Sequence, residues 1–478
     1  MQNCNVVIVG GGSGGIGAAL AAARLGAGVC LIERHPMLGG TSTMSGVSVW
    51  EMGAGGTGVP FDLYRRMRQS PDGVGIYSFG RHGAWAQTGE TPYPGAECVI
   101  DPARMYADTL HRCGARSLRE DEAFVRANWH GVVFEPQALH RAATELLRET
   151  GNCTVLLDAV VVGVDSDGTG IRSISLGDGA KLEADVFIDA TGDGALAALC
   201  GCEMMHGQDA RSAFGEPGAP EQPTGLLNGV SLVYRITCAG DPAVEPLSDA
   251  VPDECWWREA YPAVSAAQLP CGDWQVNMLP TMEGCEYERM RVDDAYDECR
   301  RRVLSHWHHL QSNYPEFRHY LLKSVAPMLG VRETRRVVGE YVLTEHDVRG
   351  GLSGQAHDDI IAISDHAIDS HGSHAGHGGE LSEPYGIPYR CLLPRATENL
   401  LVACRAASFS SIAASSCRLS RTMMQIGQAA GTAASMAATM GIRLREVAPS
   451  VLWYSLDHQG AQLTWPASED TVKRIGRE

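Results

Sequence analysis

The sequence predicts an α/β fold: a doubly wound, three-layer sheet domain with an inserted domain of β-strands plus helices. Two junctions, in which an apolar strand runs through a glycine-rich turn into a helix, predict the parallel sheet; they are NVVIVGGGSGG at 5–15 and DVFIDATGDG at 185–194. The third observation is the stretch 205–329, where short strands, scattered tryptophans and one long helical segment replace that pattern. We expect both junctions to belong to one sheet, with the chain leaving and returning between them.

The composition indicates a globular protein with an acidic surface. Asp and Glu (57) outnumber Lys and Arg (39), for a net charge of −18, and such a surface repels a nucleic-acid backbone and anionic lipid. The 15 cysteines include no CxxC pair, which argues against zinc ribbons and iron–sulfur clusters. No apolar run reaches a membrane span of ~18 residues, and no basic leader precedes the first strand. We therefore expect a cytoplasmic protein without nucleic-acid or membrane partners.

The first junction has the spacing of a dinucleotide-binding turn. Gly10, Gly12 and Gly15 form GxGxxG, an Ala-rich helix follows, and the next apolar strand ends at Glu33, about twenty residues further on. Glycines let backbone amides approach a pyrophosphate at a helix N-terminus. The Glu33 carboxylate can accept hydrogen bonds from both ribose hydroxyls of an adenosine and repels a 2′-phosphate, which disfavours NADP. A glycine-rich turn without a ligand is the alternative.

Two further segments indicate FAD rather than NAD. The GGTS loop at 39–42 looks like the loop that FAD enzymes run along the pyrophosphate and ribityl chain; a Ser/Thr/Gly surface loop is the alternative. The DATGDG turn at 189–194 resembles the turn beside the cofactor in flavoproteins with two dinucleotide folds; a buried strand ending in a turn is the alternative. A long small-residue helix follows Ser415 and Ser416, and its N-terminus suits negative charge on a reduced flavin.

These segments predict one FAD. The residues assigned to it are Gly10, Gly12, Ser13, Gly14, Gly15, Glu33, Arg34, Gly39, Gly40, Thr41, Ser42, Val161, Thr191, Gly192, Asp193, Arg405, Ser415 and Ser416.

The ordered motifs resemble those of a known family. GGGSGG, Glu33, LGGTS, DATGDG, GVRETRRVVGEYVLT, YGIPYR, NLLVACR and RTMMQIGQAAG together resemble the bacterial FAD-dependent oxidoreductase family related to the flavin subunit of heterodisulfide reductase. That family shares its FAD fold with fumarate reductase and 3-ketosteroid dehydrogenase flavoproteins. The resemblance implies a non-covalent FAD, because the GGTSTMSG loop lacks the histidine that covalent relatives carry. Cys404 stands where the family usually has glycine, as neutral packing or as a redox-sensitive neighbour of the cofactor.

The motifs also set the expected domain boundaries. The FAD-binding domain is expected in three blocks, 1–52, 131–204 and 396–445. The other segments are an insertion of helices and loops at 53–130, a substrate domain at 205–329, an FAD/substrate-interface segment with a Gly/His-rich loop at 330–395, and a C-terminal tail at 446–478.

Catalysis by a flavin dehydrogenase needs a base and a group that orients the substrate. His371, in an Asp-x-His element with Asp369, is the candidate base; a structural histidine capping a loop is the alternative. Arg335, like Arg332, could clamp a substrate or flavin oxygen or form internal ion pairs. Tyr389 is a candidate hydrogen-bond donor in a segment that approaches the flavin in the family, or a packed aromatic. HxxHxxH at 371–377 is interpreted as a loop, and no metal is expected.

The predicted function is that of an FAD-dependent dehydrogenase or oxidase. It would transfer a hydride from a CH–OH, CH–CH or CH–N centre of a small polar or hydroxylated metabolite to the flavin, with an acceptor that the sequence does not name. One alternative is a monooxygenase that uses NAD(P)H and oxygen, although a second GxGxxG is missing. The other is a non-catalytic binding or assembly protein stabilised by FAD. A homodimer is also an expectation at this chain length.

Overall fold

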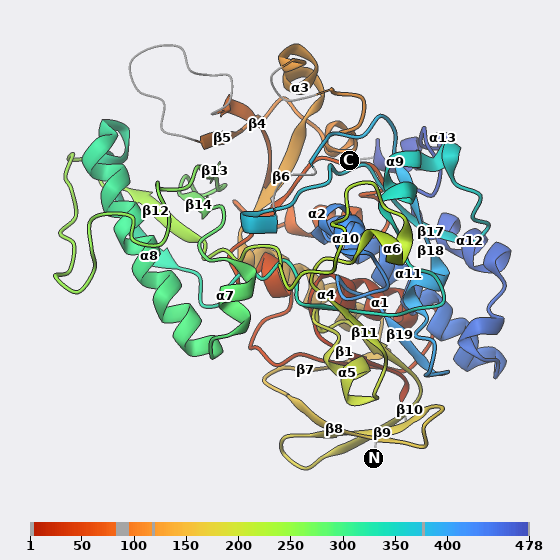
Figure 1. Cartoon of the computed structure of the whole chain (residues 1–478). Helices are drawn as coiled ribbons and strands as arrows, with labels where there is room; N and C mark the ends of the chain where they lie inside the picture. The colour runs from red at the N-terminus through yellow and green to blue at the C-terminus, as the bar shows by residue number, and fades with distance from the viewer. Residues whose placement is uncertain (1–3, 83–94, 117–119, 375–377, 477–478) are drawn as a thin grey trace.

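The computed structural model describes residues 4–82, 95–116, 120–374 and 378–476 of the chain. A parallel sheet forms the centre of the first domain and confirms the predicted α/β class (Figure 1). Its strand order is β7 (Cys153–Leu156), β2 (Val29–Ile32), β1 (Cys4–Val9), β10 (Lys181–Asp189) and β19 (Leu400–Val402). Strands that are up to nearly four hundred residues apart in sequence (4–9 and 400–402) therefore lie within one hydrogen-bonded sheet.

Strand β10 takes part in two kinds of pairing. Its C-terminal half pairs in parallel with β1 and β19, whereas Lys181–Glu183 pairs antiparallel with β9 (Ile171–Leu176). β9 in turn pairs antiparallel with β8 (Val161–Ser166), so a three-stranded extension leaves the parallel sheet. This extension is seen at the bottom of Figure 1.

Helices α1 (Ser13–Arg24) and α11 (Ser420–Met440) pack against each other beside the parallel sheet. Their backbones come very close, because a Cβ added at Gly427 would lie 2.0 Å from the carbonyl oxygen of Gly14. The same holds at Gly431, where the added Cβ would lie 2.1 Å from the carbonyl oxygen of Ala18. The small residues predicted to form a long helix thus set the distance between these two helices.

The second domain is built around an eight-stranded sheet. Its strand order is β15 (Tyr320–Val325), β12 (Tyr234–Cys238), β14 (Trp274–Met278), β13 (Val264–Gln268), β5 (Gly95–Ile100), β4 (Val74–His82), β6 (His130–Phe134) and β3 (Val49–Trp50). Helix α8 (Val292–Asn313) packs its buried residues on one face of this sheet, with Cys299, Val303 and Leu310 in a shared core with Tyr234 and Val276.

Strands β4 and β5 correct the expectation of helices and loops alone over 53–130. They were missed because Gly75, Gly80 and Gly95 interrupt the alternation of apolar and polar residues that indicates a strand. Their pairing partners are also distant, since β5 pairs in parallel with β13. Long-range pairing, rather than local propensity, stabilises such strands.

The remaining elements connect and cover the two sheets. The helices are α2 (Val59–Met67), α3 (Glu122–Asn128), α4 (Pro136–Glu149), α5 (Ala195–Leu199), α6 (Arg211–Phe214), α7 (Gly284–Glu288), α9 (Glu345–Gly354), α10 (Ser411–Cys417), α12 (Pro449–His458) and α13 (Glu469–Ile475). The remaining strands are two antiparallel pairs, β11 (Met204–His206) with β16 (Arg335–Val337) and β17 (Ile360–Ser364) with β18 (Tyr385–Pro388).

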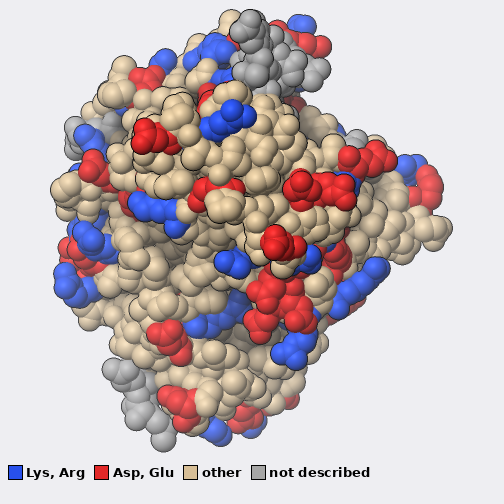
Figure 2. All heavy atoms as spheres, turned by 90° about the vertical axis from the view of Figure 1, so that its left-hand side faces the viewer, with Lys and Arg blue, Asp and Glu red and all other residues tan. Residues whose placement is uncertain are grey.

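The surface and the cysteines agree with the composition. The face in Figure 2 shows acidic and basic side chains interspersed, without a continuous basic stripe. All 15 cysteines are free thiols. Within the described ranges, none of the helices combines the length and apolar character needed to cross a bilayer.

Candidate functional site

The first glycine turn joins the end of β1 to the start of α1. Gly10 has φ +102°, a conformation that favours glycine, and a Cβ at Gly15 would lie 1.8 Å from the carbonyl oxygen of Gly10. Gly12 differs, because the nearest atom to an added Cβ is 4.0 Å away. The fold itself therefore explains two of the motif glycines, and the open space at Gly12 is the place where a pyrophosphate approaches the backbone in such turns.

The N-terminus of α1 has the donors that a pyrophosphate needs. Its N-cap is Gly12, and no side chain caps the first turn. The backbone amides of Ser13, Gly14 and Gly15 thus point out of a twelve-residue helix at its positive end. The residues present here fit the diphosphate of FAD.

Glu33 lies directly after β2 and faces this turn. Its carboxylate accepts hydrogen bonds from the backbone amides of Gly11, at 2.7 Å, and His35, at 2.9 Å. The amide of Ala159 donates to the Glu33 carbonyl at 3.0 Å, which brings the segment before Val161 beside the acid. Arg34 donates from Nε to His35. The two amide contacts hold the Glu33 carboxylate beside the glycine turn.

The GGTS loop contacts the N-terminus of α11. Gly40–Ser42 form a short 3-10 helix, and the Ser42 hydroxyl lies 3.0 Å from the hydroxyl of Ser420, the first residue of α11. A Cβ at Gly40 would lie 3.1 Å from Gly12 Cα, so the two glycine-containing loops face each other. Ser420 had no role in the sequence interpretation, although the polar RLSRT segment at 418–422, where the helix begins, was a signal for it.

The second glycine turn is held by a buried acid. Asp189 accepts hydrogen bonds from the amide and hydroxyl of Thr191, at 3.0 and 2.7 Å, and from the amide of Ala197 at 2.8 Å. Gly192 lies beside Arg405, whose guanidinium an added Cβ would meet at 2.9 Å. Arg335 donates from Nε to the carbonyl of Asp193 at 2.8 Å. Arg335 thus lies at the second turn and is not among the residues of the cavity described below.

One predicted segment, the serine pair at 415–416, has a different local structure from the one expected. Ser415 and Ser416 lie inside helix α10 rather than in a turn, and their hydroxyls donate to the carbonyls of Ile412, at 2.7 Å, and His366, at 2.6 Å. The interruption between the helices falls at Arg418 and Leu419 instead. Serines can hydrogen-bond to backbone carbonyls inside a helix, so a serine pair did not mark the break.

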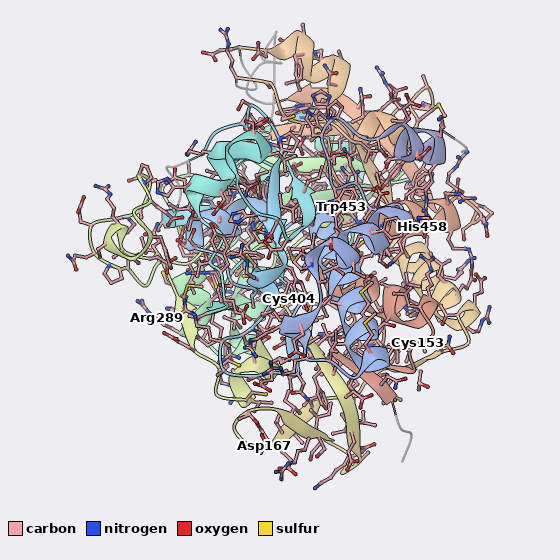
Figure 3. All side chains as sticks on the ribbon, turned by 90° about the vertical axis from the view of Figure 1, so that its right-hand side faces the viewer. Cys153, Asp167, Arg289, Cys404, Trp453 and His458 are labelled. Atoms are coloured by element: carbon pink, nitrogen blue, oxygen red, sulfur yellow. The ribbon has the colours of Figure 1, made fainter. Side chains whose placement is uncertain are left out.

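Tyr389 and Cys404 are both buried. The Tyr389 hydroxyl donates to the carbonyl of Leu444 at 3.1 Å, and its side chain belongs to the main hydrophobic core. Cys404 is 4% exposed, and burial raises the pKa of its thiol to about 12, so the thiol stays protonated. Figure 3 labels Cys404 near the middle of the molecule, in contrast to Asp167 at the tip of the β8–β9 hairpin.

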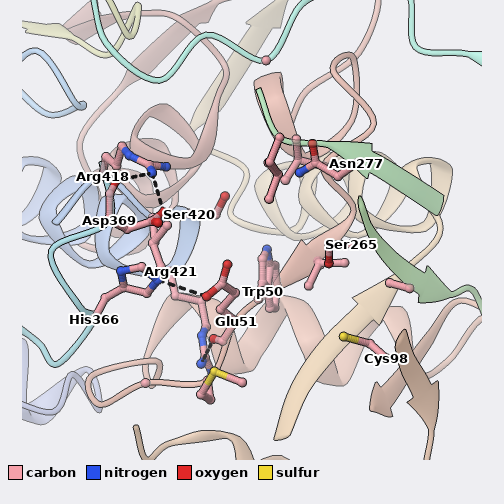
Figure 4. A pocket seen from close by; sticks show the side chains of 18 of the residues that line it. Trp50, Glu51, Cys98, Ser265, Asn277, His366, Asp369, Arg418, Ser420 and Arg421 are labelled. Carbon is pink, nitrogen blue, oxygen red and sulfur yellow. Dashed lines mark hydrogen bonds and ion pairs between the residues drawn. The ribbon is translucent and has the colours of Figure 1, made fainter. Parts of the chain in front are cut away.

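A cavity of about 620 Å³ lies between the cofactor turns and the eight-stranded sheet (Figure 4). Thr41 and Arg405, both assigned to FAD, line it together with His371. One side, here called the charged wall, consists of Glu51, Arg332, His366, Asp369, His371 and Arg418. The opposite side, here called the sheet wall, consists of Tyr77, Phe79, Cys98, Val264, Ala267 and Asn277.

Glu51, directly after β3, is the acid that links the basic side chains on one half of the charged wall. Its carboxylate accepts from Arg112 Nη1 at 2.9 Å and lies 3.0 Å from His366 Nε2. Burial raises the pKa of Glu51, but His366 and Arg112 outweigh it and hold the pKa at about 2. Arg112 also forms a two-bond pair with Glu380 and lies over the ring of Trp129. Glu51 and its partners were not predicted from the sequence.

Asp369 is the acid that links the side chains on the other half of the charged wall. Its Oδ2 atom accepts from Arg418 Nη2 and lies 2.8 Å from both that atom and His371 Nε2. Although burial opposes ionisation, His371 and Arg418 hold the pKa of Asp369 well below its ordinary value. Burial, followed by repulsion from Arg332, lowers the pKa of His371, while Asp369 acts in the opposite direction. His371 is therefore neutral at neutral pH.

The described His371 contacts fix one tautomer. An ionised carboxylate can only accept, so the Nε2–H of neutral His371 donates to Asp369 and the lone pair is on Nδ1. The His371 amide also donates to the side chain of Asn228 at 2.9 Å. His377, the last histidine of the HxxHxxH segment, lies outside the described residues.

Two guanidinium groups on the cavity have unused donors. Nε of Arg405 and Nε of Arg418 are buried and have no hydrogen-bond partner in the described structure. Burial lowers the pKa of Arg405. A buried donor without a partner is costly, and an acceptor on a bound flavin or substrate would relieve that cost. Such donors on the cavity that Thr41 also lines are a second observation in favour of a bound cofactor.

The fold and these turns define an enzyme that binds FAD and carries out oxidation or reduction. Residues 5–456 match the family described as FAD dependent oxidoreductase, and the chain belongs to that family. FAD is its cofactor, and the protein is an FAD-dependent oxidoreductase.

Other comparisons add solved structures of similar fold. A geranylgeranyl bacteriochlorophyll reductase-like protein from Thermoplasma acidophilum is 12% identical, with a TM-score of 0.47 over 100% of this chain and 96% of that one. The p-nitrophenol 4-monooxygenase PnpA from Pseudomonas putida DLL-E4 is 10% identical, with a TM-score of 0.42 over 100% and 93%. L-Amino acid deaminase from Proteus myxofaciens is 11% identical, with a TM-score of 0.41 over 95% and 93%. No curated protein matches the sequence.

Proposed function

We propose that this FAD-dependent oxidoreductase is a dehydrogenase or oxidase of a small polar or hydroxylated metabolite. It would oxidise a CH–OH, CH–CH or CH–N centre in the cavity. The observation that carries the proposal is the His371–Asp369 pair, which lies on the same cavity as Thr41 and Arg405. Bound FAD supplies the two-electron acceptor for the hydride. The base, the cofactor residues and a space for substrate are thus next to each other.

His371 has the properties of a general base in this reaction. Its lowered pKa keeps the imidazole neutral, and its Nδ1 lone pair can take the proton from the substrate hydroxyl, amine or carbon. Asp369 orients the ring and stabilises the imidazolium that results, since its carboxylate stays ionised. Arg418 holds Asp369 from the other side. Asp369 and Arg418 are positioning residues in this scheme.

The experiment is anaerobic reduction of the holoprotein, followed by the visible flavin spectrum. Hydroxy acids, sugars, amino acids and saturated acids are tested one by one, with NADH and NADPH in parallel. The proposal predicts that one class of small molecule bleaches the flavin and that a two-electron oxidised product appears in equal amount. Oxygen is then admitted: rapid reoxidation identifies an oxidase, and slow reoxidation a dehydrogenase. Bleaching by NADH or NADPH alone would instead identify a monooxygenase or a reductase.

The motif resemblance also suggests a relation to the flavin subunit of heterodisulfide reductase. We propose that any such relation is one of ancestry, because this chain lacks the cysteine clusters that hold iron–sulfur centres in those proteins. Partners other than a small-molecule substrate and an electron acceptor are not required by the scheme. We also propose that the chain forms a homodimer, which sedimentation of the holoprotein would test.

A further inference from the structure

Arg332 differs from Arg418, the other arginine of the charged wall, in forming no ion pair in the described structure. Both of its hydrogen bonds come from Nη1, which donates to the carbonyl of Gly229 at 2.7 Å and to the hydroxyl of Ser231 at 2.9 Å. Arg418, in contrast, is paired with Asp369. Burial, and then repulsion from Arg418, lowers the pKa of Arg332 to about 9, while Asp369 and Glu51 act in the opposite direction, so the group is still charged at neutral pH. A charge in this position is best compensated by an anion.

The contacts of Arg332 also select which edge of the guanidinium faces a ligand. Nη1 is occupied, and in the described residues Nε and Nη2 have no hydrogen-bond partner. Nε and Nη2 form the edge that binds a carboxylate with two parallel hydrogen bonds. The residue lines the cavity, and this edge carries the donors that remain for a ligand there.

The sheet wall opposite Arg332 is suited to an apolar body. Tyr77, Cys98 and Ala267 are uncharged and nearly buried, and they line the cavity from β4, β5 and β13. One polar exception is Asn277, which faces the charged wall across the cavity in Figure 4 and whose Oδ1 is buried without a partner. A ligand that fits both walls has an anionic end, an apolar middle and one hydrogen-bond donor.

We propose that the substrate is a small carboxylate, bound through its carboxylate to the Nε/Nη2 edge of Arg332 with Arg418 beside it, and with its body against the sheet wall. The identification of this carboxylate as the substrate rests on the proposed function, but the binding mode can be tested without turnover. His371 lies near both arginines in this arrangement, since both of them act on its pKa. The oxidised centre would therefore be close to the carboxylate, as in a hydroxy acid or an amino acid.

The test is calorimetric binding of two probes of the same shape to the FAD-loaded protein: phenylacetate and its neutral analogue phenylacetamide. We expect phenylacetate to bind at least about tenfold more tightly, because a two-bond charged contact is available to the acid alone. In Arg332→Gln this preference should disappear, while phenylacetamide affinity stays the same. Arg332→Lys, which keeps the charge but not the two-donor edge, should retain part of the preference.

The matched control is Arg289→Gln, since Arg289 is exposed at the end of α7, away from the cavity. It should bind both probes like the wild type. Equal affinity of the wild type for the two probes, including no measurable affinity for either, would overturn the inference, and so would an unchanged preference in Arg332→Gln. Loss of bound FAD from a folded Arg332→Gln protein would also overturn it, by assigning the guanidinium to the cofactor.

The wild-type comparison of acid and amide decides the question even where Arg332→Gln fails to fold. The proposed function and the binding mode can also be contradicted independently of each other. Arg332-dependent binding of phenylacetate with no compound able to reduce the flavin would contradict the proposed function and leave the binding mode intact. Flavin reduction by neutral compounds alone, at the same rate in wild type and Arg332→Gln, would contradict the binding mode and leave the proposed function intact.

Discussion

The charged wall and the sheet wall enclose the same cavity but differ in how their side chains are held. On the charged wall, each acid is fixed by at least two partners: Glu51 by Arg112 and His366, and Asp369 by His371 and Arg418. On the sheet wall, the side chains pack by shape, and Cys98 and Ala267 are close to the smallest that a strand can present. Preorganised charge supports proton transfer, whereas a surface of apolar side chains selects by volume. From the proposed function we expect proton transfer at the charged wall and selection by volume at the sheet wall.

The largest expected effect is on the charged wall. Replacing the base, in His371→Gln, should slow anaerobic flavin reduction by about 10²–10⁴-fold, the usual contribution of a general base. Substrate affinity should change little, since the ring is not the anion-binding group. Rapid mixing of holoprotein with the reducing compound measures both quantities. His206→Gln is the control, because His206 forms a similar pair with Glu288 on the surface. Equal rates for His371→Gln and the control would remove His371 from the chemistry.

The second effect is a shift in pH dependence. Flavin reduction at saturating substrate should fall as pH drops below the pKa of His371, because the protonated ring cannot accept a proton. The charged groups that act on the ring are Asp369, Arg332 and Arg418. Asp369 raises the pKa of His371, so Asp369→Asn should move the acid limb to lower pH. Arg332 lowers that pKa, so Arg332→Gln should move the limb to higher pH. Shifts in the same direction in both variants would contradict this electrostatic assignment.

The sheet wall should respond in affinity rather than in rate. Ala267→Leu adds bulk on the face of β13 that lines the cavity, so KM should rise about tenfold while kcat stays within about twofold. The neighbouring Ala266 points to the other face and packs in the core with α8, so Ala266→Leu should lower the melting temperature and leave KM unchanged. Steady-state kinetics and thermal unfolding of the two variants separate the faces. A fall in kcat with unchanged KM in Ala267→Leu would place chemistry on the sheet wall.

The smallest effect concerns stability. The pKa of Glu51 is about 2 in the folded protein against an ordinary 4.5, so its ionised form stabilises the fold above pH 4.5, and this contribution is lost as pH falls toward 2. Because the side chain is 45% exposed on the cavity, Glu51→Gln should cost only about 1 kcal/mol at pH 7. Urea unfolding of both proteins should show the difference shrinking between pH 4.5 and 2. A pH-independent difference would mean that shape, not charge, is responsible.

The cofactor half of the site was largely predictable because its signals are local. GxGxxG, the acid about twenty residues later and the GGTS loop each depend on short spacings, and the structure places Gly12, Glu33 and Gly40 around one turn. Thr41, Arg405 and His371 could also be named from the sequence, and they share the cavity. Whether each assigned residue contacts FAD stays a prediction, which a structure of the holoprotein would test.

The charged wall was less predictable because its members come from distant segments. Glu51 meets His366 across more than 300 residues, and nothing in the neighbourhood of either residue indicates the pairing. Arg418 and Ser420 were overlooked for another reason: the serine pair before them was interpreted as a turn that precedes the long helix, while α10 continues through it. Tyr389, named for a segment near the flavin, is instead a core residue with its hydroxyl bonded to Leu444. Motif position alone does not tell which face of a segment meets the cavity.

The central claim is that a small molecule bound against the charged wall reduces the flavin directly. The most direct measurement is anaerobic single-turnover reduction of the holoprotein by a reducing compound and by the same compound with deuterium at the carbon to be oxidised. The account predicts complete bleaching without any nicotinamide and a slower reaction with the deuterated compound, because that C–H bond breaks in the reduction step. Bleaching that requires NADH or NADPH, with no response to any deuterated small molecule, would contradict it.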